Sequence, residues 1–434
     1  MHSVGQIHQP PVDIGSRRPL RICLLSYRGN PTVGGQGVYI KYLGRALRDL
    51  GHRVDVIAGP PYPEVPDGIR LHKLPGLDLY NPDHLFKVER YSDLLSPLNQ
   101  LEFLSMSSGG FPEPFTFGCR VYRYFRKKRP RYDVVHDNQC LAYGLLGLPR
   151  LGFPTVATIH HPITVDRKTE LAAAPDWLRR IKVRRWYSFL RMQLRVSRKL
   201  SRIITVSECS KNDISRAFRI PADRFRIVPN GINTDFFHPL PGIERRPHHL
   251  IVTNSADMPL KGLRYLLLAV ASIRKKRPIH LTVIGTPKKD GMVERLVSDL
   301  GIGESVRFTG RIASEEFARC YAEATMAVIP SLYEGFGMPA GEAMACGVPV
   351  VSTTGGALPE VVGDAGILVP PGDSAALEKA ILFLLDHPER RSSLGKAGRE
   401  RVNGSLTWEQ AARKTVQIYE EEIRDHGRLR QASA

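Results

Sequence analysis

The stretch that decides the fold of this chain is Pro330-Ser331-Leu332-Tyr333-Glu334-Gly335-Phe336-Gly337-Met338-Pro339-Ala340-Gly341-Glu342-Ala343-Met344-Ala345-Cys346-Gly347-Val348-Pro349-Val350-Val351. It reads as a strand, a glycine-rich loop and a helix, with two carboxylates eight residues apart. Glu334, just after the strand, can face a cleft, and Glu342 is predicted in the first helical turn, where the helix dipole favours its charge. A purely capping role is the alternative for Glu342. Donors for hydroxyl or phosphate groups come from the loop amides of Gly335, Phe336, Gly337 and Met338.

Outward from this stretch, short apolar runs alternate with helical patterns from about residue 20 onward. This alternation is typical of parallel sheets covered by helices. A first series of strands is predicted at residues 21–26, 53–58, 133–136, 155–160, 202–206 and 225–228, and a second at 250–253, 280–284, 306–308, 326–329 and 348–352. The predicted fold class is therefore α/β, with two Rossmann-like parallel-sheet domains whose ligand binds in the cleft between them.

The predicted domain organisation follows from the segments between these series. Residues 1–19 are expected to be a disordered tail, residues 20–235 an N-terminal domain and residues 245–405 a C-terminal domain, with the linker near residues 233–249. Residues 61–114 have no clear period and are predicted to be an irregular insertion near the cleft. No apolar stretch is long enough to cross a bilayer and no signal-peptide core is found, so a cytoplasmic chain is expected.

The chain is strongly basic: 62 Lys and Arg against 43 Asp and Glu give a net charge of +19. No acidic residue occurs from Trp177 to Ser207, and a second basic block spans Arg120 to Arg131. The apolar spacing from Trp177 onward predicts an amphipathic helix, either packed on the core with a solvated basic face or docked on anionic lipid through Arg179–Arg202. A nucleic-acid- or polyanion-binding protein is the alternative function, but no reader motif is found and no nucleic acid is expected as a partner.

The glycine-rich turn and the cysteines limit the classes of chemistry that this chain can perform. The turn Gly34-Gly35-Gln36-Gly37, after the first strand, could cradle a phosphate or simply make a tight turn. Its spacing differs from Gly-X-Gly-X-X-Gly, which disfavours a dinucleotide oxidoreductase. The six cysteines include no Cys-X-X-Cys pair, which disfavours a disulfide framework or a thiolate zinc site.

The Glu-X7-Glu string resembles that of the retaining nucleotide-sugar glycosyltransferases of family 4, which have the two-domain GT-B fold. The resemblance covers residues 20 to 425 and includes several further segments: Gly34 to Gly37, Thr158-Ile159-His160-His161, Thr205-Val206-Ser207, Val228 to Asn233, Lys261-Gly262-Leu263, Val306 to Gly310, and Gly355-Gly356 before Pro359-Glu360. Nucleotide-sugar epimerases and glycogen-type phosphorylases share the architecture, but the Glu-X7-Glu string argues against both.

The resemblance implies a role for each matching residue. Glu342 would hold the ribose hydroxyls, Glu334 would contact the sugar ring with the loop amides, and Lys261 would neutralise the departing diphosphate. His160 would touch the transferred sugar, whereas His161 could be a packing residue. The final helix, at residues 407–425, would cross back to the N-terminal, acceptor-binding domain. Further donor-binding candidates are Gly34, Gly35, Ser255, Gly310 and Arg311.

One departure from the family pattern concerns the diphosphate. The family carries Gly-Arg a few residues before Lys-Gly, whereas this chain reads Asn254-Ser255-Ala256-Asp257-Met258-Pro259-Leu260-Lys261-Gly262. Lys288 or Arg311 could replace the missing arginine, Ser255 could bond the phosphate instead, or activity could be weak.

The expected reaction moves a sugar from a UDP- or GDP-sugar to a hydroxyl of a lipid-linked or saccharide acceptor in cell-envelope glycan or glycolipid synthesis. The family retains anomeric configuration, and a front-face displacement would need no protein nucleophile, so both glutamates are expected to position substrate. The sequence contains no Asp-X-Asp pair. Catalysis without metal or cofactor is therefore expected. An anionic membrane surface is a further expected partner, through peripheral attachment of the chain to the inner face of the membrane.

Overall fold

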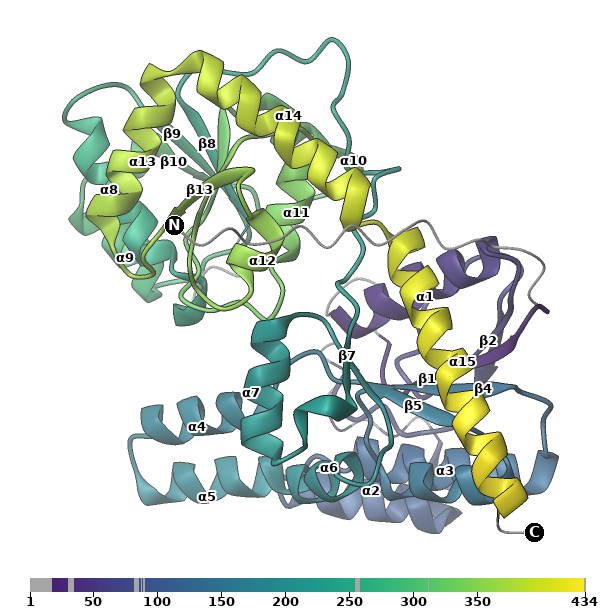
Figure 1. Cartoon of the computed structure of the whole chain (residues 1–434). Coiled ribbons are helices and arrows are strands. Elements are labelled where there is room, and N and C mark those ends of the chain that lie inside the picture. Colours follow the sequence, from purple (N-terminus) through teal and green to yellow (C-terminus); the bar gives the residue numbers. More distant parts are fainter. Residues whose placement is uncertain are drawn as a thin grey trace.

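The computed structural model of the chain describes residues 18–29, 35–81, 86, 88, 90–253, 258–310 and 312–432. Its strands form two parallel sheets, one in each half of the molecule (Figure 1). The first sheet has the order β3-β2-β1-β4-β5-β6-β7 and the second the order β10-β9-β8-β11-β12-β13. The predicted fold class, two Rossmann-like parallel-sheet domains, is confirmed.

The bounds of the strands agree with the apolar runs, with small shifts at their ends. The first sheet consists of β1 (Arg21–Ser26), β2 (Arg53–Ala58), β3 (Arg70–Lys73), β4 (Val134–Asn138), β5 (Thr155–Thr158), β6 (Ile203–Thr205) and β7 (Phe225–Ile227). The second consists of β8 (His249–Thr253), β9 (His280–Ile284), β10 (Val306–Phe308), β11 (Met326–Ile329), β12 (Val350–Thr353) and β13 (Gly366–Val369).

Helices cover both faces of each sheet, so the central strands are apolar on both faces. In β1, Cys23 and Leu25 enter one core of the first sheet, while Ile22 and Leu24 enter the other. The longer helices are α1 (Gly35–Asp49), α2 (Pro97–Ser107), α3 (Glu113–Lys128), α4 (Ile163–Ala173), α7 (Glu208–Phe218), α8 (Leu263–Arg274), α9 (Met292–Asp299), α10 (Ser314–Glu323), α11 (Met338–Ala345), α13 (Ser374–Asp386) and α14 (Pro388–Ser405), with the short α12 at Leu358–Val362.

The prediction of an irregular segment at residues 61–114 is wrong. This segment contains the edge strand β3, the 3-10 helix η1 (Tyr91–Leu95) and the helix α2. Strand β3 reads Arg-Leu-His-Lys and has no buried residue, so it lacks the apolar run by which the other strands are found. Its parallel pairing with β2 makes it a strand, and that pairing is a tertiary contact.

The acid-free stretch is also not the single amphipathic helix that its spacing predicts. It forms α5 (Trp177–Trp186), a 3-10 turn at Tyr187–Phe189 and α6 (Leu190–Ser197). Trp177 and Ile181 are 68% and 50% exposed, whereas Leu190 is fully buried. The apolar residues divide because α6 packs under the first sheet, while α4 and α5 project from it (Figure 1). Within the described residues, no helix is long and apolar enough to cross a membrane.

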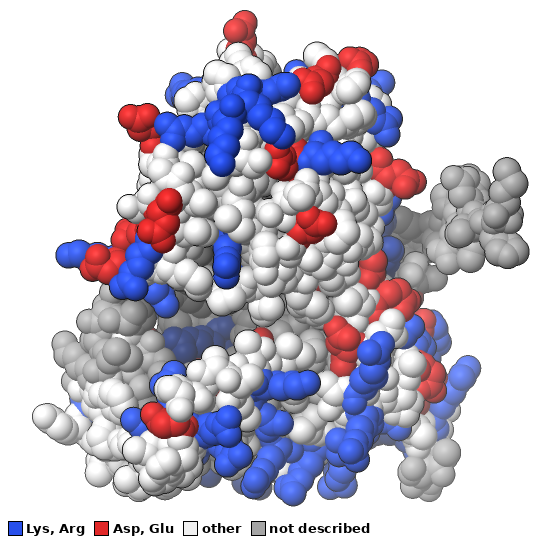
Figure 2. Space-filling view, turned by 90° about the vertical axis from the view of Figure 1, so that its left-hand side faces the viewer, with Lys and Arg blue, Asp and Glu red and all other residues white. Residues whose placement is uncertain are grey.

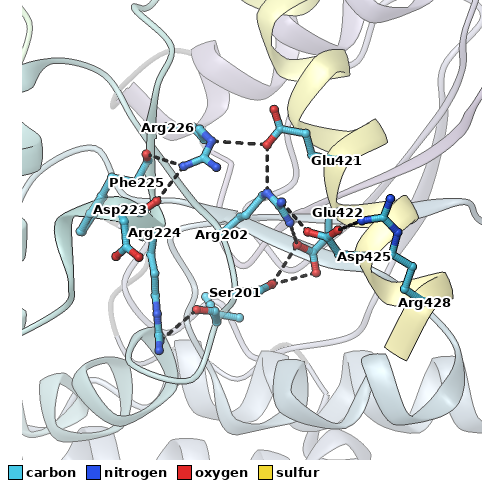
Figure 3. A network of polar contacts seen from close by, with 11 residues as sticks. Ser201, Arg202, Asp223, Arg224, Phe225, Arg226, Glu421, Glu422, Asp425 and Arg428 are labelled. Atoms are coloured by element: carbon cyan, nitrogen blue, oxygen red, sulfur yellow. Dashed lines mark hydrogen bonds and ion pairs between the residues drawn. The ribbon is translucent and has the colours of Figure 1, made fainter. Parts of the chain in front are cut away.

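The last helix, α15 (Trp408–Ala432), lies along the first sheet and not the second (Figure 1). Ala412 and Tyr419 are buried in the core that α1 shares with β1 and β2. Further along α15, Glu421, Glu422 and Asp425 all accept hydrogen bonds from the guanidinium of Arg202, at 3.1, 2.9 and 2.6 Å (Figure 3). These contacts hold the C-terminal helix on the N-terminal half of the chain.

Two chain segments cross between the halves, and they lie side by side. The amide of Ile232 donates to the carbonyl of Leu406 at 2.7 Å, and Ile232 forms a parallel bridge with Thr407. Gly231 packs so closely on Trp408 that a side chain there would collide with its backbone. The only passage of the described chain from one sheet to the other is therefore this paired connection.

Candidate active site

The cleft between the two sheets holds a cavity of about 480 Å³. Both halves of the chain contribute to its wall, mainly through loops that follow the carboxyl ends of strands. The lining residues used below are Gln36, Tyr39, His160, His161, Lys261, Glu334, Gly335 and Trp408. A site in this position is where parallel α/β sheets place their ligands.

Lys261 and Glu334 form an ion pair on the side of the second sheet. Lys261 Nζ donates to Glu334 Oε1 at 2.8 Å, and Ser331 Oγ donates to the same oxygen at 2.8 Å. The two loops are close because Gly262, with φ +67°, packs against the carbonyl of Pro330, where a side chain could not fit. The side chain of Glu334 is 11% exposed and that of Lys261 28% exposed. The lysine ammonium is thus fixed at the edge of the cavity.

The loop after Glu334 presents its amides while its carbonyls are occupied. The carbonyl of Glu334 accepts from the Ala357 amide at 2.8 Å, and that of Gly335 accepts from Ser207 Oγ and Ser210 Oγ at 2.9 and 3.0 Å. Within the described residues, no hydrogen bond uses the amides of residues 335–338 as donors. Free amides before a helix are a favourable environment for phosphate oxygens.

The structure corrects the position of Glu342. Helix α11 begins at Met338 and has no acidic residue in its first turn, so Glu342 lies in the second turn and caps nothing. Its carboxyl is not among the groups that line the cavity. Burial raises the pKa of Glu342 to about 7.

His160 and His161 follow β5 and differ in their surroundings. His160 Nε2 lies 2.8 Å from Asn138 Oδ1, and the Tyr39 ring meets the imidazole edge-on at 4.7 Å between centroids. Burial lowers the pKa of His160 to about 3, so its ring is neutral. His161 Nε2 lies 2.8 Å from Asp166 Oδ2, and both side chains are about 40% exposed. No sequence motif marks Asn138, so no role was predicted for it.

Several sequence-predicted residues lie away from this cavity or outside the described residues. Gly34, Ser255 and Arg311 are outside the described part of the chain. Gly35 begins α1, and Gly310, with φ +70°, follows β10, its amide donating to the Gly285 carbonyl at 3.2 Å. Lys288 is exposed and does not line the cavity. The structure therefore brings together His160, Lys261, Glu334 and the loop 335–338.

Comparison with known proteins places this site in a family. Residues 33–236 match the family described as Glycosyltransferase Family 4, and residues 246–387 match Glycosyl transferases group 1. An MMP alpha-(1->4)-mannosyltransferase of Mycolicibacterium hassiacum is 45% identical over 93% of this chain and 98% of that protein. The chain belongs to glycosyltransferase family 4. The predicted family and the glycosyltransferase activity are confirmed.

Other relatives of this glycosyltransferase agree with that assignment. A D-inositol 3-phosphate glycosyltransferase of Streptomyces scabiei is 27% identical over 99% of this chain and 98% of that protein. The structure of a sucrose-phosphate synthase from Thermosynechococcus elongatus matches with a TM-score of 0.66 and 26% identity, over 92% of this chain and 98% of that one. The Anabaena protein HepE matches with a TM-score of 0.67 at 17% identity, over 92% and 99% of the two chains. The predicted GT-B fold is confirmed.

Proposed function

We propose that this glycosyltransferase moves a hexosyl group, mannosyl by preference, from a UDP- or GDP-linked donor to a hydroxyl of a lipid-linked or saccharide acceptor. The observation that carries the proposal is the Lys261 ammonium, held 2.8 Å from Glu334 in the same cavity as four loop amides that donate no hydrogen bond within the described residues. This arrangement suits a diphosphate next to a sugar. The preference for mannose is supported by the name of the mannosyltransferase that is 45% identical.

The proposed chemistry needs stabilisation of negative charge and no protein nucleophile. The bond from the anomeric carbon to the diphosphate breaks, the acceptor oxygen bonds to that carbon on the same face, and the acceptor proton passes to the departing phosphate. Lys261 and the loop amides stabilise the negative charge that develops on this phosphate. Glu334 already accepts two hydrogen bonds, so its remaining acceptor capacity is available to orient sugar hydroxyls. Configuration at the anomeric carbon is retained.

Glu342 is proposed to hold the ribose of the donor. Two ribose hydroxyls can donate to one carboxylate, and charge-assisted bonds of this kind are stronger than neutral ones. Transfer is also proposed to need neither metal nor cofactor, because the ammonium and the amides can replace a divalent cation at the diphosphate. Turnover that survives exhaustive chelation with EDTA is expected, and loss of turnover that Mg²⁺ or Mn²⁺ restores would contradict this part.

The test of the proposed function is a donor and acceptor panel. The full chain is incubated with GDP-mannose, UDP-mannose, GDP-glucose and UDP-glucose, each with mannosyl and glucosyl oligosaccharides, and nucleotide release and product are measured. We expect one mannosyl donor to give an elongated product, with an α linkage by NMR. Nucleotide release that is equal with and without every acceptor would contradict the saccharide-acceptor assignment.

We further propose that the projecting helix α5 docks this enzyme on an anionic lipid surface at the inner face of the membrane, where a lipid-linked acceptor could be reached. Exposed Trp177, Leu178 and Ile181 lie among exposed Arg179, Arg180 and Lys182. Figure 2 shows Lys and Arg side chains gathered along the lower edge of this face, at the level of α4 and α5 in Figure 1. An apolar stripe flanked by cations is the composition of interfacial helices.

Vesicle flotation tests the docking surface. The wild-type chain should float with vesicles that contain phosphatidylglycerol, less so as salt rises, because exposed charges are screened over about 8 Å at physiological ionic strength. A variant with Arg179, Arg180 and Lys182 changed to Ser should lose flotation. The matched control changes the exposed Lys379, Arg390 and Arg399 of the other half to Ser. Equal loss in both variants would show a net-charge effect and overturn the assignment to α5.

A further inference from the structure

The end of β4 and the loop after it combine buried polar side chains with left-handed backbone conformations. Asp137 and Asn138 are fully buried, and the following Gln139 and Leu141 adopt φ values of +56° and +52°. Non-glycine residues in this left-handed region are costly and persist where the surroundings demand them, often at functional sites. The loop lies next to His160, and its side chains form hydrogen bonds with that histidine.

The amide of Asn138 has only one orientation that fits its two neighbours. Its Nδ2 lies 3.3 Å from the carbonyl oxygen of Gln36, in the turn that opens α1, and its Oδ1 lies 2.8 Å from His160 Nε2. A carbonyl can only accept a hydrogen bond, so the nitrogen end of the amide must face Gln36. The end that faces His160 is therefore the oxygen, which also can only accept. His160 Nε2 must then carry the proton of the bond.

The remaining contacts fix the histidine in place. The His160 amide donates to Gln139 Oε1 at 2.8 Å, and Gln139 Nε2 donates to the His161 carbonyl at 3.3 Å. Since burial keeps the ring neutral, protonation at Nε2 leaves Nδ1 with a lone pair. Within the described residues, no hydrogen bond involves Nδ1. His160 lines the cavity and is partly exposed, so a hydroxyl of a bound sugar is a suitable partner for this lone pair.

We propose that Asn138 is a positioning residue that holds His160 as the Nε2-protonated tautomer and so makes Nδ1 the acceptor for one hydroxyl of the transferred sugar. The identity of the sugar rests on the proposed function, whereas the tautomer does not. A site built to bond one hydroxyl rejects analogues that lack it, because its polar group is then left without a partner. Asn138 thereby acts on donor selection without touching the donor.

Replacing Asn138 with Asp gives a change of charge at the same shape. A carboxylate next to Nε2 favours the imidazolium, so the His160 pKa should rise and activity should fall at low pH as Nδ1 takes a proton. The other titratable or charged groups around this ring are Tyr39 of α1, His136 of β4, His161, Asp166 of α4, and Lys261 and Glu334 across the cavity. They are the same in both proteins, so a difference between the two pH profiles reports the new carboxylate.

The direct measurement is long-range ¹H–¹⁵N NMR of the full chain labelled at histidine, with the His160 signals assigned by their loss in His160→Gln. The wild type should show the pure Nε2–H pattern between pH 6 and 9, and Asn138→Ala a mixture of tautomers.

With GDP-mannose, Asn138→Ala should lower kcat about tenfold. Mono-deoxy donors test the hydroxyl: at one position the wild type should discriminate strongly and Asn138→Ala weakly. Asn99→Ala is the control, because it removes another buried, hydrogen-bonded amide of the same half.

Two results would overturn the role of Asn138. One is an Nδ1–H or mixed pattern for His160 in an active wild-type enzyme. The other is discrimination among deoxy donors that is equal in the wild type and in Asn138→Ala. A pure Nε2–H pattern that Asn138→Ala abolishes, in a protein that transfers no sugar from any donor, would instead overturn the proposed function and support the positioning role.

Discussion

At the scale of single residues, burial alters the chemistry of Glu342. Its pKa is raised to about 7 by loss of solvation, against an ordinary value of 4.5. Well below pH 4.5 the carboxyl is protonated in both the folded and the unfolded chain, so it does not lower the free energy of unfolding. As pH rises from 4.5 to 7, the unfolded chain loses this proton first, so the free energy of unfolding falls, and above pH 7 the penalty is constant.

We therefore expect Glu342→Gln to stabilise the fold at pH 8, by on the order of 2 kcal/mol, and much less at pH 5. The same change should lower kcat/KM for the donor by about 10- to 100-fold, because a charge-assisted bond to ribose is lost. Urea unfolding at both pH values and donor kinetics measure the two effects. Destabilisation at pH 8 with unchanged donor kinetics would mean that Glu342 is a structural residue.

Lys261 carries a second residue-scale prediction. Lys261→Ala should lower kcat by about 100- to 1000-fold with a smaller effect on donor KM, because the charge on the departing phosphate develops fully only in the transition state. The fold should survive, since Ser331 still bonds Glu334. The control is Lys276→Ala, which removes an exposed lysine paired with Glu378 at 2.7 Å in the same half. Equal loss in both variants would remove Lys261 from the site.

At the scale of elements, α15 depends on Arg202. This guanidinium is 13% exposed and bonds three carboxylates, of which Glu422 is only 8% exposed (Figure 3). Arg202→Met should leave the buried Glu422 carboxylate without its cation, with only the Ser201 hydroxyl as a hydrogen-bond donor, and lower the free energy of unfolding by about 2–4 kcal/mol. Hydrogen exchange should rise across residues 415–428.

The matched control lies on the same helix. Arg413 pairs with Glu409 at 2.6 Å, and both side chains are well exposed, at 39% and 63%. Arg413→Met should cost less than about 1 kcal/mol, because exposed pairs contribute little. If Arg202→Met costs no more than this control and exchange in α15 is unchanged, the packing on α1 alone holds the helix.

At the scale of the whole molecule, the two halves meet at the N-terminus of α7. Glu360 of the C-terminal half accepts from the amides of Glu208 and Cys209 at 2.7 and 2.8 Å, and Tyr333 donates to Asp213 Oδ2 at 2.6 Å. A carboxylate at a helix N-terminus is favoured by the helix dipole. Ser207 and Ser210 bind the Gly335 carbonyl at the same contact between the halves. Contact between the halves therefore also positions the loop of residues 335–338.

Glu360→Ala should weaken this contact between the halves. We expect a larger radius of gyration by solution X-ray scattering and a roughly tenfold lower kcat/KM, since a hydrogen bond to a charged group contributes about 1.5–3 kcal/mol. Glu389→Ala, in the exposed first turn of α14, is the control. A radius of gyration and kinetics equal to those of the control would show that Glu360 does not hold the halves together.

The sequence by itself determined the architecture and the family. Strands such as 280–284 and 326–329 were predicted with their true bounds because a strand covered on both faces must be apolar, and that requirement is visible in a short window. The Glu-X7-Glu string marked the loop at Glu334 because glycine and free amides next to a carboxylate are a local arrangement.

Only the tertiary structure decided what depends on partners distant in the sequence. The polar strand β3 exists through its pairing with β2, and the acid-free stretch divides because α6 packs on the sheet and α5 does not. The raised pKa of Glu342 likewise depends on the groups that the fold packs around α11. Asn138 and His160 are separated by 22 residues, and no spacing rule predicts their hydrogen bond. Local pattern encodes burial and turn geometry, whereas a hydrogen bond between two loops is set by where the packed core places the ends of its strands.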